Sequence, residues 1–90
     1  MKVYYRTEDG LEDYRFDIVQ LSSGNWRAYI LESPDYCGRA TDSHSTHRLN
    51  DGGRPYVCWD SAIGSLQQAK QVVALWANKT QDYIKYGTRF

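Results

Sequence analysis

The sequence predicts an α+β fold: a single antiparallel sheet of about four strands, in the order β-β-β-loop-β-α, with one long C-terminal helix packed across one face. Two observations support this prediction. Residues 14–32 alternate apolar and polar side chains with the period of two that a half-buried strand requires. Residues 65–86 repeat apolar side chains with a helical period. The long polar segment 36–54 shows neither period, so we expect a loop there.

The chain is expected to form one domain over residues 1–90, because 90 residues provide material for only one core. Aromatic residues make up 14% of the sequence, including eight tyrosines and three tryptophans. Each large ring can bury roughly 150 to 250 Å². A core of this kind does not need a disulfide or a metal to hold it.

The strands are predicted in chain order. Residues 3–6, VYYR, are rich in β-forming residues and are followed by a polar turn. In the hairpin 14–32, the segment SSGN supplies the turn. Pro34 ends the hairpin because proline cannot donate to a ladder. The last strand is expected at 55–60, PYVCWD, with Pro55 in its first position.

The helix is expected at residues 65–86. Ser65 and Gln68 form a capping-box pattern, and Gly87 offers a C-terminal stop. Trp76 lies at the centre of the apolar stripe and should anchor the core, whereas Leu75 projects away from it. The stripe that should face the sheet comprises Leu66, Ala69, Val72, Val73, Trp76, Ala77, Thr80, Tyr83 and Ile84.

Charge and targeting signals narrow the function classes. The formal net charge is zero, which argues against a strong general affinity for nucleic acid. The first 36 residues carry four basic and seven acidic side chains, and the remaining residues carry seven basic and four acidic ones. No segment resembles a signal peptide or a membrane span, so we expect a cytoplasmic protein.

The loop contains most of the candidate binding residues. Its hydroxyl and aspartate side chains can bond to nearby backbone groups and fix an irregular loop in one shape. Such a shaped loop can present a surface to a partner, most simply another protein, and no cofactor is expected. The residues we single out for binding are Arg39, Asp42, His44, Thr46, His47, Arg48, Arg54 and Tyr56.

Two chemical alternatives use the same loop. Cys37, His44, His47 and Cys58 are ligands that zinc accepts, but their spacing lacks the close cysteine pair of zinc fingers. Cys37 could also act as a nucleophile, with His44 or His47 as its base and Asp42 or Asp51 as the group that orients the base. No nucleophile elbow or phosphate-binding glycine loop accompanies these residues. We therefore predict no metal site and no enzyme.

Single-stranded nucleic acid is a third alternative. Exposed aromatic rings on a sheet can stack bases, and Arg39, Arg48 and Arg54 could reach phosphates. No RNA-recognition signature accompanies these residues, and the acidic first part of the chain would repel a phosphate backbone.

The phrases THRL, YVCW and SLQQAKQVVALWANKTQDYIKYG resemble a group of small uncharacterised proteins of conjugative transposons and related mobile elements of Gram-positive gut bacteria. The resemblance implies a bacterial host and an accessory role, including counter-defence against a host nuclease, and transfers no catalytic residue. The sequence thus predicts a non-enzymatic interaction module that acts through its polar loop.

Overall fold

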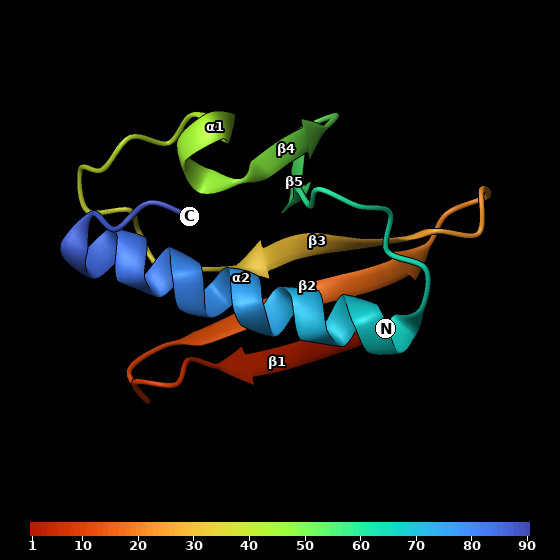
Figure 1. Ribbon diagram of the computed structural model, residues 1–90, viewed down its shortest axis with the longest axis horizontal. Coiled ribbons are helices and arrows are strands. Elements are labelled where there is room, and N and C mark those ends of the chain that lie inside the picture. Colours follow the sequence, from red (N-terminus) through yellow and green to blue (C-terminus); the bar gives the residue numbers. More distant parts are fainter.

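A computed structural model describes all residues from 1 to 90, and it confirms the α+β class (Figure 1). One sheet of five antiparallel strands has the order β1-β2-β3-β5-β4. The long helix α2 crosses one face of this sheet. The strands are β1 (Lys2–Arg6), β2 (Asp13–Gln20), β3 (Trp26–Glu32), β4 (Arg48–Asp51) and β5 (Arg54–Val57), and the helices are α1 (Ser43–Thr46) and α2 (Leu66–Tyr86).

The predicted hairpin of residues 14–32 is the centre of the sheet. β2 and β3 pair from Gln20 opposite Trp26 to Arg15 opposite Glu32, with a bulge between Arg15 and Phe16. The expected alternation is observed in β2, where Tyr14, Phe16 and Ile18 are buried. The prediction at 3–6 is also confirmed, because β1 pairs with the other side of β2.

The segment predicted as one loop, 36–54, contains a short helix and an extra strand. α1 and β4 both lie in it, and β4 forms a hairpin with β5. The fold therefore has five strands rather than about four. β4 has the sequence RLND, which lacks the alternation of a half-buried strand, so its ladder with β5 rather than its own pattern makes it a strand.

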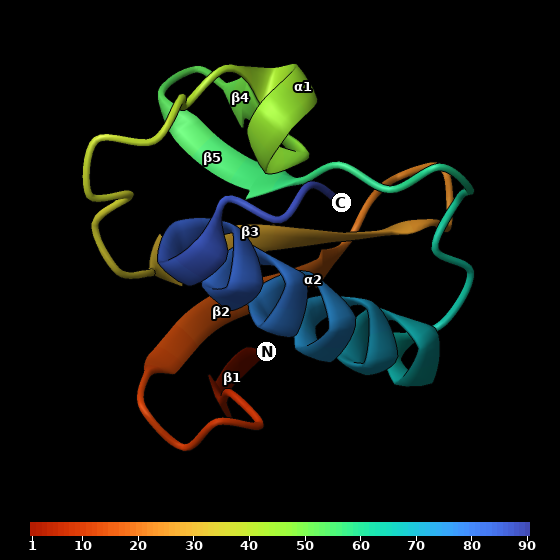
Figure 2. The same cartoon turned by 60° about the vertical axis from the view of Figure 1, so that its left-hand side comes forward.

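The last strand is shorter than the expected 55–60. β5 ends at Val57, and the chain then runs to α2, touching the sheet again only at an isolated bridge between Ile63 and Trp26. β5 joins β3 through a single paired position, Tyr29 opposite Tyr56. The β4–β5 hairpin and α1 consequently project from one side of the molecule, as Figure 2 shows.

Helix α2 begins and ends as the sequence predicts. Ser65 is the N-cap, and its hydroxyl accepts a hydrogen bond from the Gln68 backbone N–H over 3.1 Å. The Gln68 side chain reaches the N–H of Gly64, one residue before the cap. Gly87 closes the helix in the left-handed conformation at φ 73°.

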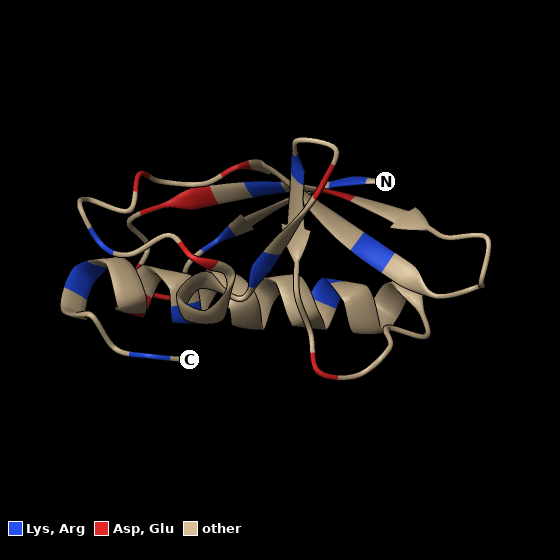
Figure 3. Cartoon of the chain, turned by 90° about the horizontal axis from the view of Figure 1, so that it is seen from above, with Lys and Arg blue, Asp and Glu red and all other residues tan.

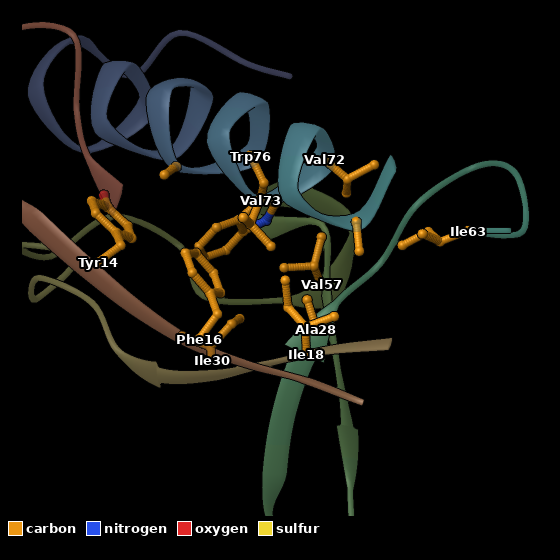
Figure 4. Packing of buried hydrophobic residues seen from close by; sticks show 12 residues of the cluster. Tyr14, Phe16, Ile18, Ala28, Ile30, Val57, Ile63, Val72, Val73 and Trp76 are labelled. Carbon is orange, nitrogen blue, oxygen red and sulfur yellow. The ribbon is translucent and has the colours of Figure 1, made fainter. Parts of the chain in front are cut away.

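Trp76 is the centre of the core between helix and sheet (Figure 4). Its side chain is fully buried and meets the rings of Tyr14 and Phe16 edge-on, each at 5.9 Å between centroids. Edge-to-face pairs of this kind add to the gain from burial. The predicted stripe is buried or half-buried along its length, and Leu75 is 44% exposed, as expected. No helix is both long and apolar enough to cross a membrane.

Candidate functional site

The polar loop is held by its own side chains. Asp42 is the N-cap of α1, and its carboxylate accepts a hydrogen bond from the Ser45 backbone N–H over 3.1 Å. Hydrogen bonding to Ser45 holds the pKa of Asp42 below its usual value. Asp42 therefore acts in this structure as a capping residue, in agreement with the expectation that the loop's polar groups fix its shape.

Thr46 and His47 also serve the loop's conformation. Thr46 is fully buried, so it is unable to contact a partner directly, and its hydroxyl donates to the Asp42 carbonyl over 2.8 Å. His47 is the C-cap of α1 in the left-handed conformation, and its ring stacks on Phe90 at 4.5 Å. Neither residue presents its side chain freely, as a direct binding role would require.

Helix α2 anchors the same segment through hydrogen bonds to its backbone. The Trp76 indole N–H donates to the Thr46 carbonyl over 3.1 Å, and the Tyr83 hydroxyl donates to the Ala40 carbonyl over 2.8 Å. In return, Arg39 donates to the carbonyls of Ile84 and Lys85 at the end of α2. Arg39 is thus a C-terminal cap for the helix.

Unlike those of Asp42 and Thr46, the side chains of His44 and Arg48 make no hydrogen bond within the loop. His44 is exposed and makes no side-chain hydrogen bond. Arg48 lies over the buried ring of Tyr36, at 4.7 Å from the ring centroid. Arg48 also lines a hollow of about 470 Å³ beside the β4–β5 hairpin, together with Thr41, Ser43, Leu49, Asn50, Gly53 and Pro55. Arg48 is the one charged side chain that lines the hollow, and no carboxylate, imidazole or thiol lines it.

The other two predicted residues lie elsewhere, on the face of the sheet that α2 leaves open. Arg54 and Tyr56 come from β5, and the structure places them against Arg27 and Tyr29 of β3 and Asp51 of β4. We call these five residues the Arg–Tyr cluster. Figure 3 shows the two layers edge-on, with α2 on one side of the sheet and no helix on the other.

The Arg–Tyr cluster is tightly connected. The Arg54 guanidinium lies 3.8 Å from the centroid of the Tyr29 ring, and that of Arg27 lies 4.1 Å from the centroid of Tyr56. The Tyr29 hydroxyl donates to Asp51 over 2.8 Å and accepts from Arg27 over 3.2 Å. Tyr29 itself is buried beneath the arginines, and cation–π contacts contribute about 0.5 to 1 kcal/mol at exposed sites and about 2 kcal/mol when desolvated. The cluster is therefore ordered in advance of any partner.

An apolar groove adjoins the cluster where β3 and β5 diverge. Its volume is about 180 Å³. Arg27 and Tyr56 of the cluster border it, and Trp26 and Trp59 line it together with aliphatic side chains that include Leu49 and Ile63. Because β3 and β5 share only one paired position, the sheet leaves room for this groove.

Three of the five cluster residues were missed by the sequence-based prediction. The sequence signal for Arg27 and Tyr29 was the alternation of β3, which turns their side chains to the other face of the sheet from Ala28 and Ile30. Asp51 carried no such signal, since it belongs to a strand that only its pairing reveals.

The thiols and imidazoles do not gather into a metal-binding group. No group of three or more His, Cys, Asp or Glu side chains is placed to hold a metal ion. Both cysteines are free; Cys37 is exposed, and its thiol contacts only the carbonyl of Asp35.

Comparison with known proteins adds no relative. No family model matches the sequence, and no curated protein or solved structure matches it significantly.

Proposed function

We propose that this chain is a non-enzymatic binding module for another protein, and that the Arg–Tyr cluster with its adjoining groove is the contact surface. The observation that carries the proposal is the preordered stack of Arg54 on Tyr29 and Arg27 on Tyr56, on a sheet face that no helix covers. The resemblance to mobile-element proteins suggests the setting, an accessory role in a bacterial cytoplasm.

The composition of this surface is that of a protein-binding hot spot. Residues that contribute most to interfaces are enriched in Trp, Tyr and Arg and cluster around desolvated pockets. Here Arg27 and Tyr56 of the cluster border a groove that Trp26 and Trp59 also line. An apolar side chain of a partner would fill the groove, while the arginines would contact its rim.

Preordering favours binding because side chains that are already fixed lose little conformational entropy when a partner binds. Fixing a flexible side chain at an interface costs about 0.5 to 1.5 kcal/mol. Arg27 is already held by Asp51 at 3.4 Å and by the Tyr29 hydroxyl. Its ordering cost has therefore been met by folding.

The charge of the cluster selects the partner. Asp51 pairs with Arg27, while Arg54 has no carboxylate partner. The cluster thus carries one uncompensated positive charge, which favours an acidic rim on the partner. The polar loop contributes Asp51 and Arg54 to this surface, whereas most of its other side chains are engaged in its own structure and His44 lies outside the cluster.

The test compares variants of the two surfaces. Affinity capture from the native host would identify a partner, and calorimetry with that purified partner would measure the dissociation constant. Arg54→Glu combined with Tyr56→Ala should weaken binding at least tenfold, because it removes the free charge and one wall of the groove. His44→Ala and Leu75→Ala are the matched controls on the loop and on the exposed helix face.

The proposal fails if the double variant melts like the wild type and still binds normally. Loss of binding in His44→Ala alone would assign the contact to the polar loop. Capture of no protein by the wild-type chain would remove the support for a protein partner.

Single-stranded nucleic acid is the second candidate, favoured by the same unpaired arginine stacked on a ring. Phosphate contacts would make binding fall steeply with salt. Fluorescence anisotropy with a labelled oligothymidine at low and physiological salt tests this directly. Salt-sensitive binding that Arg54→Glu abolishes would support it over the protein-binding proposal.

A further inference from the structure

The first strand offers an open backbone edge. β1 is at the end of the sheet and pairs only with β2. Backbone hydrogen bonds join Met1 to Ile18 and Thr7 to Glu12, so the odd-numbered residues of β1 form the bonded pairs with β2. In an antiparallel ladder, the intervening residues direct their N–H and C=O groups away from the neighbouring strand. Lys2, Tyr4 and Arg6 therefore present their backbone groups to solvent.

An apolar groove runs beside this edge on the helix side of the sheet. It has a volume of about 280 Å³ and is lined by Val3, Tyr4, Tyr5, Lys70 and Val73. Val3 and Tyr5 are half-buried against the core, and Val73 is buried in α2. A strand added beside β1 would place alternate side chains in this groove.

On the other side of the edge, the cations Lys2, Arg6 and Arg15 outnumber the two carboxylates of β2, Asp17 and Asp13, which lie opposite Lys2 and Arg6. Lys2 makes no ion pair, and Arg6 binds Asp13 through two hydrogen bonds of 2.9 Å while remaining exposed. Between them Tyr4 is 74% exposed, with Arg15 lying 5.9 Å from its ring centroid. Side chains of an added strand on this side would meet two cations flanking an aromatic ring.

We propose that the β1 edge binds an extended, acidic segment of another protein as a sixth, antiparallel strand. Residues directly opposite one another in a sheet point to the same face. Positions opposite Lys2 and Arg6 would then be acidic, and positions opposite Val3 and Tyr5 would be apolar. The segment recognised has the alternation acidic, apolar, any residue, apolar, acidic, and its backbone bonds to Lys2, Tyr4 and Arg6.

A second copy of this chain is a poor occupant for the same reason. Two β1 strands related by a two-fold axis at Tyr4 would set Lys2 of each copy opposite Arg6 of the other. Like charges directly opposite in a sheet destabilise the pairing. Charged residues on an edge strand are also a known protection against self-association. The charges that prevent pairing with itself are those that attract an acidic strand.

The experiment uses the full chain and a fluorescein-labelled peptide, Gly-Glu-Val-Thr-Val-Glu-Gly, in an anisotropy titration. Two control peptides replace both glutamates by lysine or scramble the order. The wild-type chain should bind the glutamate peptide at least tenfold more tightly than either control. Failure to bind it, or equal binding of the lysine peptide, would overturn the proposal.

Tyr4→Pro provides the decisive variant. Proline removes the outward N–H of residue 4 but no bond to β2, and edge strands tolerate it at such positions. Tyr4→Thr is the matched control, because it also removes the ring but keeps the N–H. Tyr4→Pro should lose at least tenfold in affinity, whereas Tyr4→Thr should stay within about threefold. Equal binding by both variants, with unchanged melting, would exclude backbone pairing at this edge.

Further measurements separate this inference from the proposed function. Lys2→Glu should weaken binding of the glutamate peptide and strengthen binding of the lysine peptide. Amide exchange at Lys2, Tyr4 and Arg6 should slow in the complex, and a lack of new protection there would contradict the proposal.

The Arg54→Glu/Tyr56→Ala variant separates this inference from the proposed function, because it should bind the peptide normally. If it does not, the peptide occupies the Arg–Tyr cluster instead. Sedimentation should give a monomer, and a dimer disrupted by Tyr4→Pro would assign the edge to a second copy.

Discussion

Asp9, in the turn between β1 and β2, shows how a single exposed carboxylate can stabilise this fold. It accepts hydrogen bonds from the Thr7 hydroxyl and from the Leu11 backbone N–H, and it lies 3.2 Å from the Lys85 ammonium of α2. These contacts, the Thr7 hydroxyl first among them, lower the pKa of Asp9 to about 2. The residue thereby connects the first turn of the sheet to the last turn of the helix.

The low pKa of Asp9 predicts how stability depends on pH. The pKa of an aspartate in an unfolded chain is about 3.9, which is higher than the value of Asp9 in the folded protein. Folding therefore favours the charged carboxylate. Its stabilising contribution is present above the unfolded pKa and is lost as the pH falls toward about 2. Asp9→Ala should therefore lower the urea midpoint at pH 6, and the difference from wild type should shrink as the pH falls through about 2. Asp60→Ala, at an exposed carboxylate without hydrogen bonds, is the control; a similar pH-dependent loss there would contradict this account.

At the scale of elements, local pattern was enough where a segment buries one regular face. The β2–β3 hairpin and α2 each expose an apolar period in the sequence, and both were predicted nearly to their ends. β4 was not, because RLND has no such period and becomes a strand only through β5. The Arg–Tyr cluster needed the same tertiary information, since Asp51 reaches Tyr29 only when the hairpin joins β3.

The cap of α2 gives a prediction at this scale. Ser65 satisfies the Gln68 N–H, one of the backbone donors that a helix leaves without an internal partner. Ser65→Ala should lower the free energy of unfolding by about 1 kcal/mol. Urea denaturation followed by circular dichroism measures this change. Gln67→Ala, at an exposed helix position, should change stability by less than about 0.5 kcal/mol. Equal effects of the two variants would mean that the cap contributes nothing.

At the scale of the whole molecule, the fold has two parts of unequal size. We call β1, β2, β3 and α2 the body, and α1 with the β4–β5 hairpin the arm. β1, β2, β3 and α2 supply most of the core around Trp76, whereas the β4–β5 hairpin adds only Val57 to it and pairs with β3 at one position. The arm is held by Val57 in the core, by the Arg–Tyr cluster, and by two hydrogen bonds from α2, in which the Trp76 indole donates to Thr46 and the Tyr83 hydroxyl donates to Ala40. Because the Arg–Tyr cluster spans body and arm, its geometry depends on these anchors.

Removing one anchor should therefore loosen the arm more than the body. Tyr83→Phe deletes the hydroxyl that donates to Ala40 and should cost about 1 kcal/mol. Native-state amide exchange should then speed up in residues 43–57 by more than in β2, because the arm can open without unfolding the core. Tyr86→Phe, at a ring that is 68% exposed, should leave both regions unchanged. If exchange in β2 accelerated equally in Tyr83→Phe, the arm and body would form one cooperative unit, and the binding surface would be as rigid as the core beneath it.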